Sequence, residues 1–211
     1  MNYFKLLFFI GFFISLKASF GQVEKSVYDS IPLIKNDSLK VKYIIDKIIE
    51  PLIDNSKFEN AAIEINNARK YIKNENDFRL KNKFVAILIK QENYEEAKEI
   101  ISQYEQEAIK LKNNIQHGQC LRHRAEIELN SGNLDKSSIY YFKALDKFIL
   151  SKNSRNIALS YSDIGVISFY NENYNQAIYY WNKSILLDKL NNNKKSMANN
   201  LSNISLAYIE L

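Results

Sequence analysis

One segment, Asn173-Tyr174-Asn175-Gln176-Ala177, occurs four times in related form along this sequence of 211 residues. Each copy has a polar residue, a bulky residue, two polar residues and a small residue. The other copies are Lys57-Phe58-Glu59-Asn60-Ala61, Asn93-Tyr94-Glu95-Glu96-Ala97 and Asn133-Leu134-Asp135-Lys136-Ser137. The bulky members lie at positions 58, 94, 134 and 174, at intervals of 36, 40 and 40 residues. A recurring interval of this size indicates an array of structural repeats.

Each copy opens a stretch with the apolar spacing of one helix face. After Tyr174 this face consists of Ala177, Ile178, Trp181, Ile185 and Leu186. An earlier helix precedes each copy, and in the clearest repeat its apolar face consists of Ile157, Tyr161, Ile164 and Ile167, with Gly165 small enough to admit a neighbouring helix. We therefore expect two antiparallel helices per repeat. One pair cannot bury its apolar face alone, so successive pairs must stack into a solenoid.

The composition favours the same fold class. Hydrophobic residues make up 46% of the chain and charged residues 25%, as in folded proteins. Five glycines and two prolines leave little material for the tight turns of a sheet protein, whereas helices joined by short polar loops need few such residues. The sequence predicts an all-α protein.

The repeats resemble the tetratricopeptide family, whose motif has a large residue and Leu-Gly in the first helix and Ala-x-x-x-Phe in the second. The match is best over residues 158–189, which carry Tyr161, Ile164-Gly165, Tyr174, Ala177 and Trp181 at the motif positions. Repeat three keeps Gly132, Leu134, Tyr141 and Ala144, with Ala125 in place of the glycine. Ser168 replaces the family tyrosine, no proline closes a repeat, and the period exceeds the usual value of about 34 residues. The resemblance implies a right-handed superhelix of antiparallel helix pairs over residues 37–211, with repeats at about 37–76, 77–114, 115–154, 155–194 and a partial repeat at 195–211.

The first residues are typical of an export signal. Lys5 precedes the apolar run Leu6 to Leu16, and small residues follow around Ser19 and Gly21. We predict a signal peptide over residues 1–21, cleavage that leaves Gln22 first, a linker over 22–36, and a location in the periplasm or cell envelope. No cysteine lies near the cleavage position, so a lipid-modified cysteine is not expected. Retention of the segment as a membrane anchor is the alternative.

Neither the charges nor the motifs of the sequence predict a catalytic, metal or cofactor site. Without Lys5 and Lys17, 27 basic residues face 24 acidic ones, and the two signs are interspersed, so we expect neither a nucleic-acid nor a membrane footprint. No glycine-rich phosphate loop is present, so no nucleotide cofactor is expected. The donors His117, Cys120 and His123 are spread around one helix, which favours a semi-buried thiol between two surface histidines over a metal site. We predict no catalytic residues, no metal and no cofactor.

In the family that the chain resembles, first helices line a concave groove that holds a peptide or a partner helix. The matching positions predict these partner-binding residues: Arg79, Asn82, Ala86, Ile89, Arg122, Glu126, Leu129, Ser162, Val166 and Phe169. The arginines suit a carboxylate-bearing peptide, and the apolar members suit apolar side chains. The predicted function is a non-enzymatic scaffold of the cell envelope that binds a protein or peptide.

The last residues repeat the first-helix pattern, with Leu201, Ile204, Leu206, Ala207 and Tyr208 lying 40 residues after their counterparts in repeat four. Solenoid ends normally carry a polar helix face. We therefore expect self-association through this helix or continuation of the polypeptide. The alternative function is an extracytoplasmic sensory or input region of a longer signalling protein, with a histidine kinase or DNA-binding output beyond residue 211.

Overall fold

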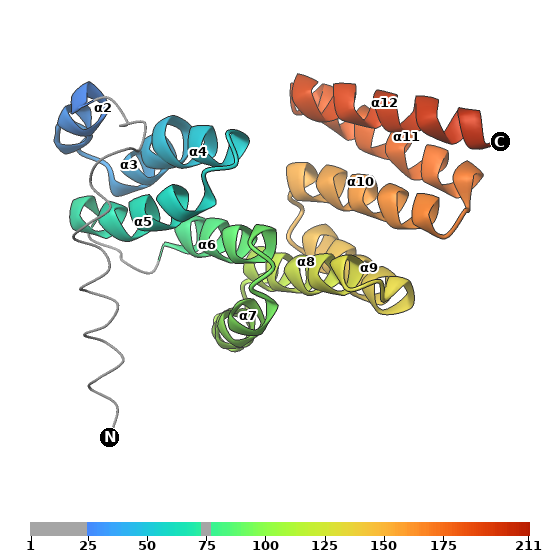
Figure 1. The fold of residues 1–211 in the computed structure, drawn as a ribbon, viewed down its shortest axis with the longest axis horizontal. Helices are drawn as coiled ribbons and strands as arrows, with labels where there is room; N and C mark the ends of the chain where they lie inside the picture. The colour runs from blue at the N-terminus through green and yellow to red at the C-terminus, as the bar shows by residue number, and fades with distance from the viewer. Residues whose placement is uncertain (1–24, 73–76) are drawn as a thin grey trace. The chain divides into compact units, whose positions relative to one another are not determined.

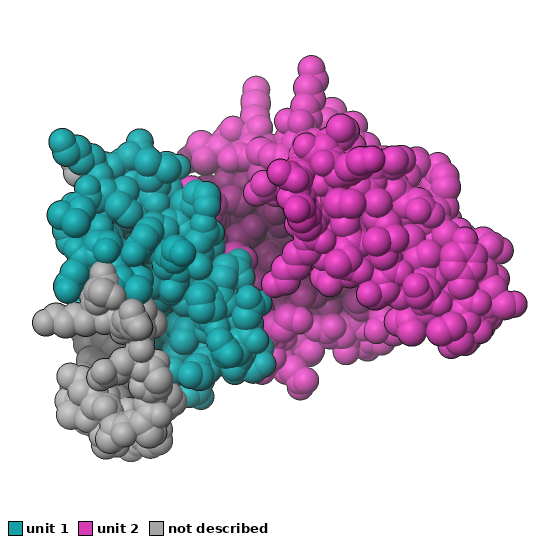
Figure 2. Space-filling model, turned by 90° about the horizontal axis from the view of Figure 1, so that it is seen from above, with its two compact units in different colours: residues 1–75 teal, residues 76–211 magenta. Residues whose placement is uncertain are grey.

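A computed structural model describes residues 25–72 and 77–211, and the regular elements within these ranges are all helical. The chain divides into two compact units, residues 1–75 and residues 76–211, which Figure 2 shows in different colours. Within the described ranges, no helix has both the length and the hydropathy needed to cross a bilayer. The predicted signal segment, residues 1–21, lies outside them.

In its described part, residues 25–72, the first unit contains one helix pair preceded by short helical turns. Its elements are α2 (Lys25–Ser30), the 3-10 turn η1 (Ile31–Leu33), α3 (Asp37–Ile44), the π-helical turn η2 (Ile45–Ile49), α4 (Glu50–Asp54), α5 (Phe58–Ala68) and the 3-10 turn η3 (Arg69–Tyr71). Pro51 has no N–H to donate to the preceding turn, which accounts for the wider π turn before it. Residues 22–36, expected to be a linker, include α2 and η1, and Ile31 is fully buried. This segment is therefore anchored by its own apolar side chain.

The second unit contains three helix pairs and a further first helix. Its elements are α6 (Phe78–Lys90), α7 (Tyr94–Lys110), α8 (Asn114–Asn130), α9 (Leu134–Leu150), α10 (Ser154–Tyr170), α11 (Tyr174–Leu190) and α12 (Lys194–Glu210). Figure 1 shows α10, α11 and α12 as successive neighbours, and each consecutive pair of these helices is in contact. The bulky residue of each repeated segment is the first residue of a second helix, namely α5, α7, α9 or α11. The predicted helix pairs are confirmed by these contacts.

The same capping residue starts successive first helices. The side-chain oxygens of Asn113, Asn153 and Asn193 accept hydrogen bonds from backbone N–H groups three residues ahead. Such caps satisfy donors that have no partner within the helix. The turns before the second helices contain a residue in the left-handed region, for example Glu92 at φ 58° and Gly132 at φ 77°. These local signals fix the repeat boundaries in the second unit.

Close helix contacts in the core depend on two glycines. A β-carbon built on Gly165 of α10 would lie 2.5 Å from Nε1 of Trp181 in α11, and one on Gly118 of α8 would lie 2.5 Å from the ring of Phe148 in α9. Trp181 and Phe148 are among the largest fully buried side chains. The role predicted for Gly165 is confirmed, whereas that of Gly118 was not recognised in the sequence.

Candidate functional site

Polar side chains join the first helices of consecutive repeats. Nε2 of His123 in α8 lies 3.0 Å from Oδ1 of Asn82 in α6. Nε of Arg122 donates to Oδ2 of Asp163 in α10 at 2.6 Å, and the Ser162 hydroxyl donates to Oδ1 of Asn200 in α12 at 2.6 Å. We call these three contacts the inter-repeat ladder. Partners separated by 38 to 41 residues fix the register in which the helix pairs stack.

The central contact of the ladder is an ion pair with limited access to solvent. The side chains of Arg122 and Asp163 are 21% and 15% exposed. Burial lowers the pKa of Arg122, but the negative charges of Asp163 and Glu126 outweigh it, so the net direction is upward. Burial raises the pKa of Asp163, and the neighbouring guanidinium opposes that rise. Each charge therefore depends on the other for stabilisation.

His123 lies between two hydrogen-bond acceptors. Its Nε2 faces the Asn82 carbonyl oxygen, and its Nδ1 lies 3.6 Å from a carboxylate oxygen of Glu126. Burial lowers the pKa of His123, and the imidazole is then neutral at pH 7, with a single N–H donor. Burial alone would raise the pKa of Glu126, but the histidine contact and the charge of Arg122 lower it to about 2. The carboxylate is therefore ionised beside the ladder.

The predicted polar groove residues mostly contact other protein groups. Asn82, Arg122 and Ser162 are members of the ladder, and Glu126 lies next to His123. Arg79 forms an ion pair with Asp77 at the start of α6, with Nη2 and Oδ2 2.7 Å apart. The prediction missed His123, Asp163 and Asn200 as ladder partners. Their spacing of about one repeat from a predicted residue is the signal that would have found them.

The predicted apolar groove residues divide between the core and its edge. Ile89 is only 1% exposed and packs in a cluster with Val85, Ala97 and Cys120, so its side chain is inaccessible to a partner in this conformation. Leu129, Val166 and Phe169 are partly buried against the core, and Ala86 is also half-buried. Of the five predicted apolar residues, only these four keep some exposed surface.

The three candidate metal donors do not converge. Cys120 and His123 are both buried, and burial raises the pKa of the Cys120 thiol to about 12. The expectation that His123 is a surface residue is wrong, because its ring packs between α6 and α8, where it contacts Asn82. His117 instead lies 3.5 Å from a carboxylate oxygen of Glu105. Among the described residues, no three His, Cys, Asp or Glu side chains group as metal ligands would.

The ladder continues into a buried polar network at α11. Nδ2 of Asn200 donates to the Ser184 hydroxyl at 2.9 Å, and that hydroxyl lies 3.3 Å from Oδ2 of Asp188. Nδ2 of Asn193 donates to the other carboxylate oxygen at 3.1 Å. Asp188 is 1% exposed, and Phe148 occupies the equivalent position one repeat earlier. This substitution within the repeat pattern was the available sequence signal, and it was missed.

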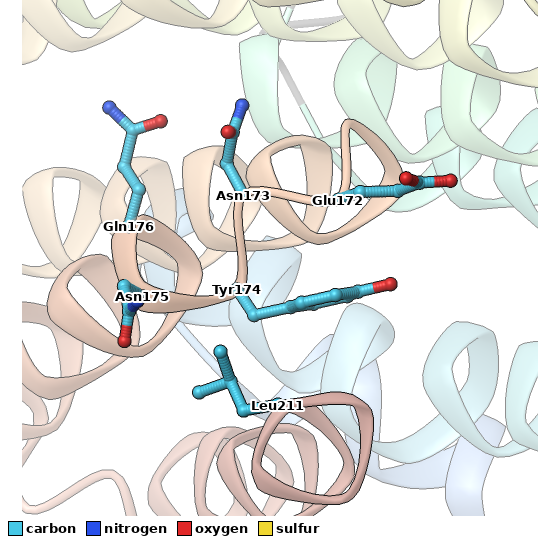
Figure 3. A pocket seen from close by; sticks show the side chains of 6 residues that line it. All are labelled: Glu172, Asn173, Tyr174, Asn175, Gln176 and Leu211. Atoms are coloured by element: carbon cyan, nitrogen blue, oxygen red, sulfur yellow. The ribbon is translucent and has the colours of Figure 1, made fainter.

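A separate hollow lies where α11 begins. Its lining residues are Glu172, Asn173, Tyr174, Asn175, Gln176 and Leu211. Figure 3 shows Tyr174 facing Leu211, while Asn173 and Gln176 extend away from them. On α12, the large apolar side chains of Leu201, Leu206, Tyr208 and Ile209 are exposed. Self-association through this helix remains a prediction.

Comparison with solved structures identifies the fold as a tetratricopeptide-like solenoid. BtubC from P. vanneervenii is 12% identical, with a TM-score of 0.59, and the match covers 89% of this chain and 81% of that one. The apo form of RapI is 16% identical, with a TM-score of 0.56, and the match covers 82% of this chain and 64% of that one. No protein-family model matches the sequence, and no curated protein matches it.

A third match is to part of a larger signalling protein. It is a signal transduction ATPase with numerous domains from Pyrococcus horikoshii, which carries a tetratricopeptide repeat sensor. The identity is 19% and the TM-score 0.55, and the match covers 88% of this chain but 29% of that one. These similarities establish the fold and leave function to be argued from the site.

Proposed function

We propose that this protein is a non-enzymatic scaffold that binds a protein or peptide on the face formed by its first helices. The observation that carries the proposal is the inter-repeat ladder, whose polar contacts link the first helices α6, α8, α10 and α12 in register. Repeat solenoids bind partners along such extended faces. The partly exposed Arg122, Glu126 and Asp163, whose side chains keep 15% to 21% of their surface, supply both donors and acceptors for an extended peptide.

The Arg122 side chain is already engaged within the protein, but only in part. The Arg122 guanidinium engages Asp163 mainly through Nε at 2.6 Å, whereas the Nη2 contact is 3.4 Å long. A peptide carboxylate can therefore approach the outer guanidinium nitrogens while Nε keeps its bond. We expect a peptide carboxylate to lie at the outer nitrogens of Arg122 and a basic or amide group of the peptide to lie at Glu126, with apolar side chains over the half-buried Val166 and Phe169.

The test is peptide selection from a random library displayed on phage, followed by fluorescence anisotropy with the full chain. The variant Arg122→Gln with Asp163→Asn removes both charges but keeps hydrogen-bonding groups at the ion pair. We expect selected peptides to bind it at least tenfold more weakly, with unchanged helical circular dichroism. The matched control Glu99→Gln alters the exposed side of α7 and should leave affinity within about twofold, because surface substitutions away from the site have small effects. Equal binding to the charge-free variant would contradict the proposal.

We also propose that the protein is exported to the periplasm or cell envelope, on the basis of residues 1–21. Amino-terminal sequencing of the protein from an envelope fraction tests this. Gln22 as the first residue supports export with cleavage, and a retained Met1 contradicts the cleavage.

The alternative function is an input region of a longer signalling protein. The supporting observation is the match to an ATPase whose repeats are named a sensor and of which this chain spans 29%. An immunoblot of native cells with an antibody against residues 77–211 distinguishes the alternatives. A band much above 24.7 kDa, the mass of the 211 residues, would favour the input region, and a band at or just below that mass would contradict it.

A further inference from the structure

The outward sides of the second helices α7, α9 and α11 differ in composition although their exposed positions correspond. Positions one repeat apart, such as Glu99, Ile139 and Tyr179, are exposed in all three helices. The same holds for Gln106, Asp146 and Leu186, and for Lys110, Leu150 and Leu190. Equivalent positions therefore change from polar to apolar along the array, which packing within a repeat does not require.

Large apolar side chains are concentrated on the outward sides of α9 and α11. Exposed on them are Ile139, Phe142, Ile149 and Leu150 of α9 and Tyr179, Leu186 and Leu190 of α11, a set that we call the outer apolar face. The outward side of α7 has only Ile109 among its exposed positions. Leu190 is 82% exposed and Leu186 66%. The solvent side of a helix is normally polar, so a contiguous apolar set marks an interaction surface.

The two halves of the outer apolar face adjoin each other. The rings of Phe142 in α9 and Tyr180 in α11 meet edge to face, with centroids 6.2 Å apart, and Tyr180 also contacts Tyr179. Along each helix the first and last apolar residues are eleven residues apart, or about 16 Å at 1.5 Å per residue. The face is therefore broad enough to contact an extended surface.

The exposed charge of the second helices also becomes more positive from α7 to α11. The outward side of α7 exposes Glu95, Glu96 and Glu99 against Lys110. The α9 side exposes two aspartates and two lysines, and the α11 side exposes Lys189 with no acid. Nζ of Lys183 lies 4.6 Å from the centroid of the Tyr179 ring, which adds a second cation beside α11. Apolar side chains thus coincide with the more cationic end.

We propose that the outer apolar face binds the surface of an anionic phospholipid membrane. The leucine, isoleucine and aromatic side chains of this face can enter the boundary between headgroups and acyl chains. Lysines between them can extend to lipid phosphates while their stems cover apolar surface. A second copy of this chain is disfavoured, because pairing two copies through this face would bring like charges on α11 together. The proposal concerns the second helices and does not depend on the first-helix face.

The structure offers a site-specific test on the full chain. Because Cys120 is the sole cysteine and is buried, a Leu190→Cys variant can be labelled selectively with an environment-sensitive fluorophore. Vesicles of phosphatidylcholine with phosphatidylglycerol should shift its emission to the blue, and phosphatidylcholine alone should shift it much less. The matched control is the same label on Glu99→Cys of α7, where no shift is expected. Equal shifts at both positions, or none at either, would overturn the proposal.

Charge and apolar variants separate the two contributions to binding. Lys143→Gln with Lys189→Gln should weaken vesicle binding of the labelled Leu190→Cys protein by on the order of fivefold per lysine. The control pair Lys98→Gln with Lys110→Gln removes the same charge from α7 and should leave binding within twofold. Phe142→Ser with Leu186→Ser should reduce the emission shift while helical circular dichroism is retained. If those serine substitutions instead lower the sedimentation mass of the protein and vesicles cause no shift, the face is an interface between copies and the membrane proposal is wrong.

Discussion

Substitution of Gly165 by alanine should destabilise the second unit, although alanine favours helices. The added methyl group would lie 2.5 Å from Nε1 and 2.6 Å from Cδ1 of Trp181, well inside a normal contact. Trp181 is 2% exposed, and its Nε1 donates to the Ser162 carbonyl oxygen at 3.2 Å, so the indole has little room to move. Overpacking of this kind costs about 3 kcal/mol at its upper range, and the helix propensity of alanine returns about 1 kcal/mol. We expect a net loss of about 2 kcal/mol.

Repeat three shows which second substitution should relieve the overpacking caused by Gly165→Ala. The position equivalent to Gly165 is Ala125 there, and the residue equivalent to Trp181 is Tyr141, which packs in one cluster with Ala125. Trp181→Tyr alone should be destabilising because it leaves a cavity and removes the bond to Ser162. Together with Gly165→Ala it reproduces the repeat-three pair. The double variant should therefore lose at least about 1 kcal/mol less than the sum of the two single variants.

Urea denaturation followed by circular dichroism at 222 nm measures all four proteins. Fluorescence of Trp181, the sole tryptophan, reports on the α10–α11 contact in the parent and in Gly165→Ala, the two proteins that retain it. A loss of about 2 kcal/mol corresponds to a fall in Tm of about 4–8 °C for a chain of this size. A Gly165→Ala variant that is as stable as the parent, or strict additivity in the double variant, would refute the argument that this contact is tight.

Three further predictions concern the ladder and the caps. Burial lowers the pKa of His123, so below about pH 6.5 the unfolded chain binds more protons than the folded chain, and the free energy of unfolding should decrease as the pH is lowered. The urea midpoint of His123→Gln should therefore change less between pH 7.5 and 5.5 than that of the parent. Arg122→Ala should cost about 2 kcal/mol or more, because Asp163 is left without its partner, and the double variant with Asp163→Ala should cost less than the sum in a double-mutant cycle. Asn153→Ala should lower the free energy of unfolding by about 1 kcal/mol, because the Asn153 side chain caps α10. The control Asn173→Ala should cost little, because the Asn173 side chain forms no cap bond. Equal losses in the two variants would contradict the capping argument.

The helices followed from local sequence signals. The spacing of apolar residues after Tyr174 is enough to predict α11, and the recurrence of that pattern predicts stacking of the pairs. The close approach at Gly165 was also predictable, because its counterpart in the family motif is a glycine. Local periodicity is informative here because each repeat contacts mainly its neighbours.

The site was less predictable because its contacts join residues about 40 positions apart. Periodicity places Asn82 and Arg122 on first helices, but it does not show that His123 and Asp163 turn toward them. Ile89 occupies a groove position in the family motif, yet here its side chain is in the core. The outer apolar face could not be recognised from the sequence for a related reason. Charged and apolar residues alternate along each helix, and their uneven distribution becomes visible only when equivalent exposed positions of α7, α9 and α11 are compared.

The contacts of the inter-repeat ladder fix the order in which the repeats can follow one another. Each of its contacts joins a different combination of side chains: an amide with an imidazole, a guanidinium with a carboxylate, and a hydroxyl with an amide. If the segment from α8 to α9 were exchanged with that from α10 to α11, Arg122 would no longer face Asp163 across the same junction, and a half-buried charge would lack its partner. The array therefore cannot be lengthened by duplicating one unit or rearranged by transposition without new matching side chains. Growth of such a protein by tandem duplication would have to be followed by paired substitutions at each new junction.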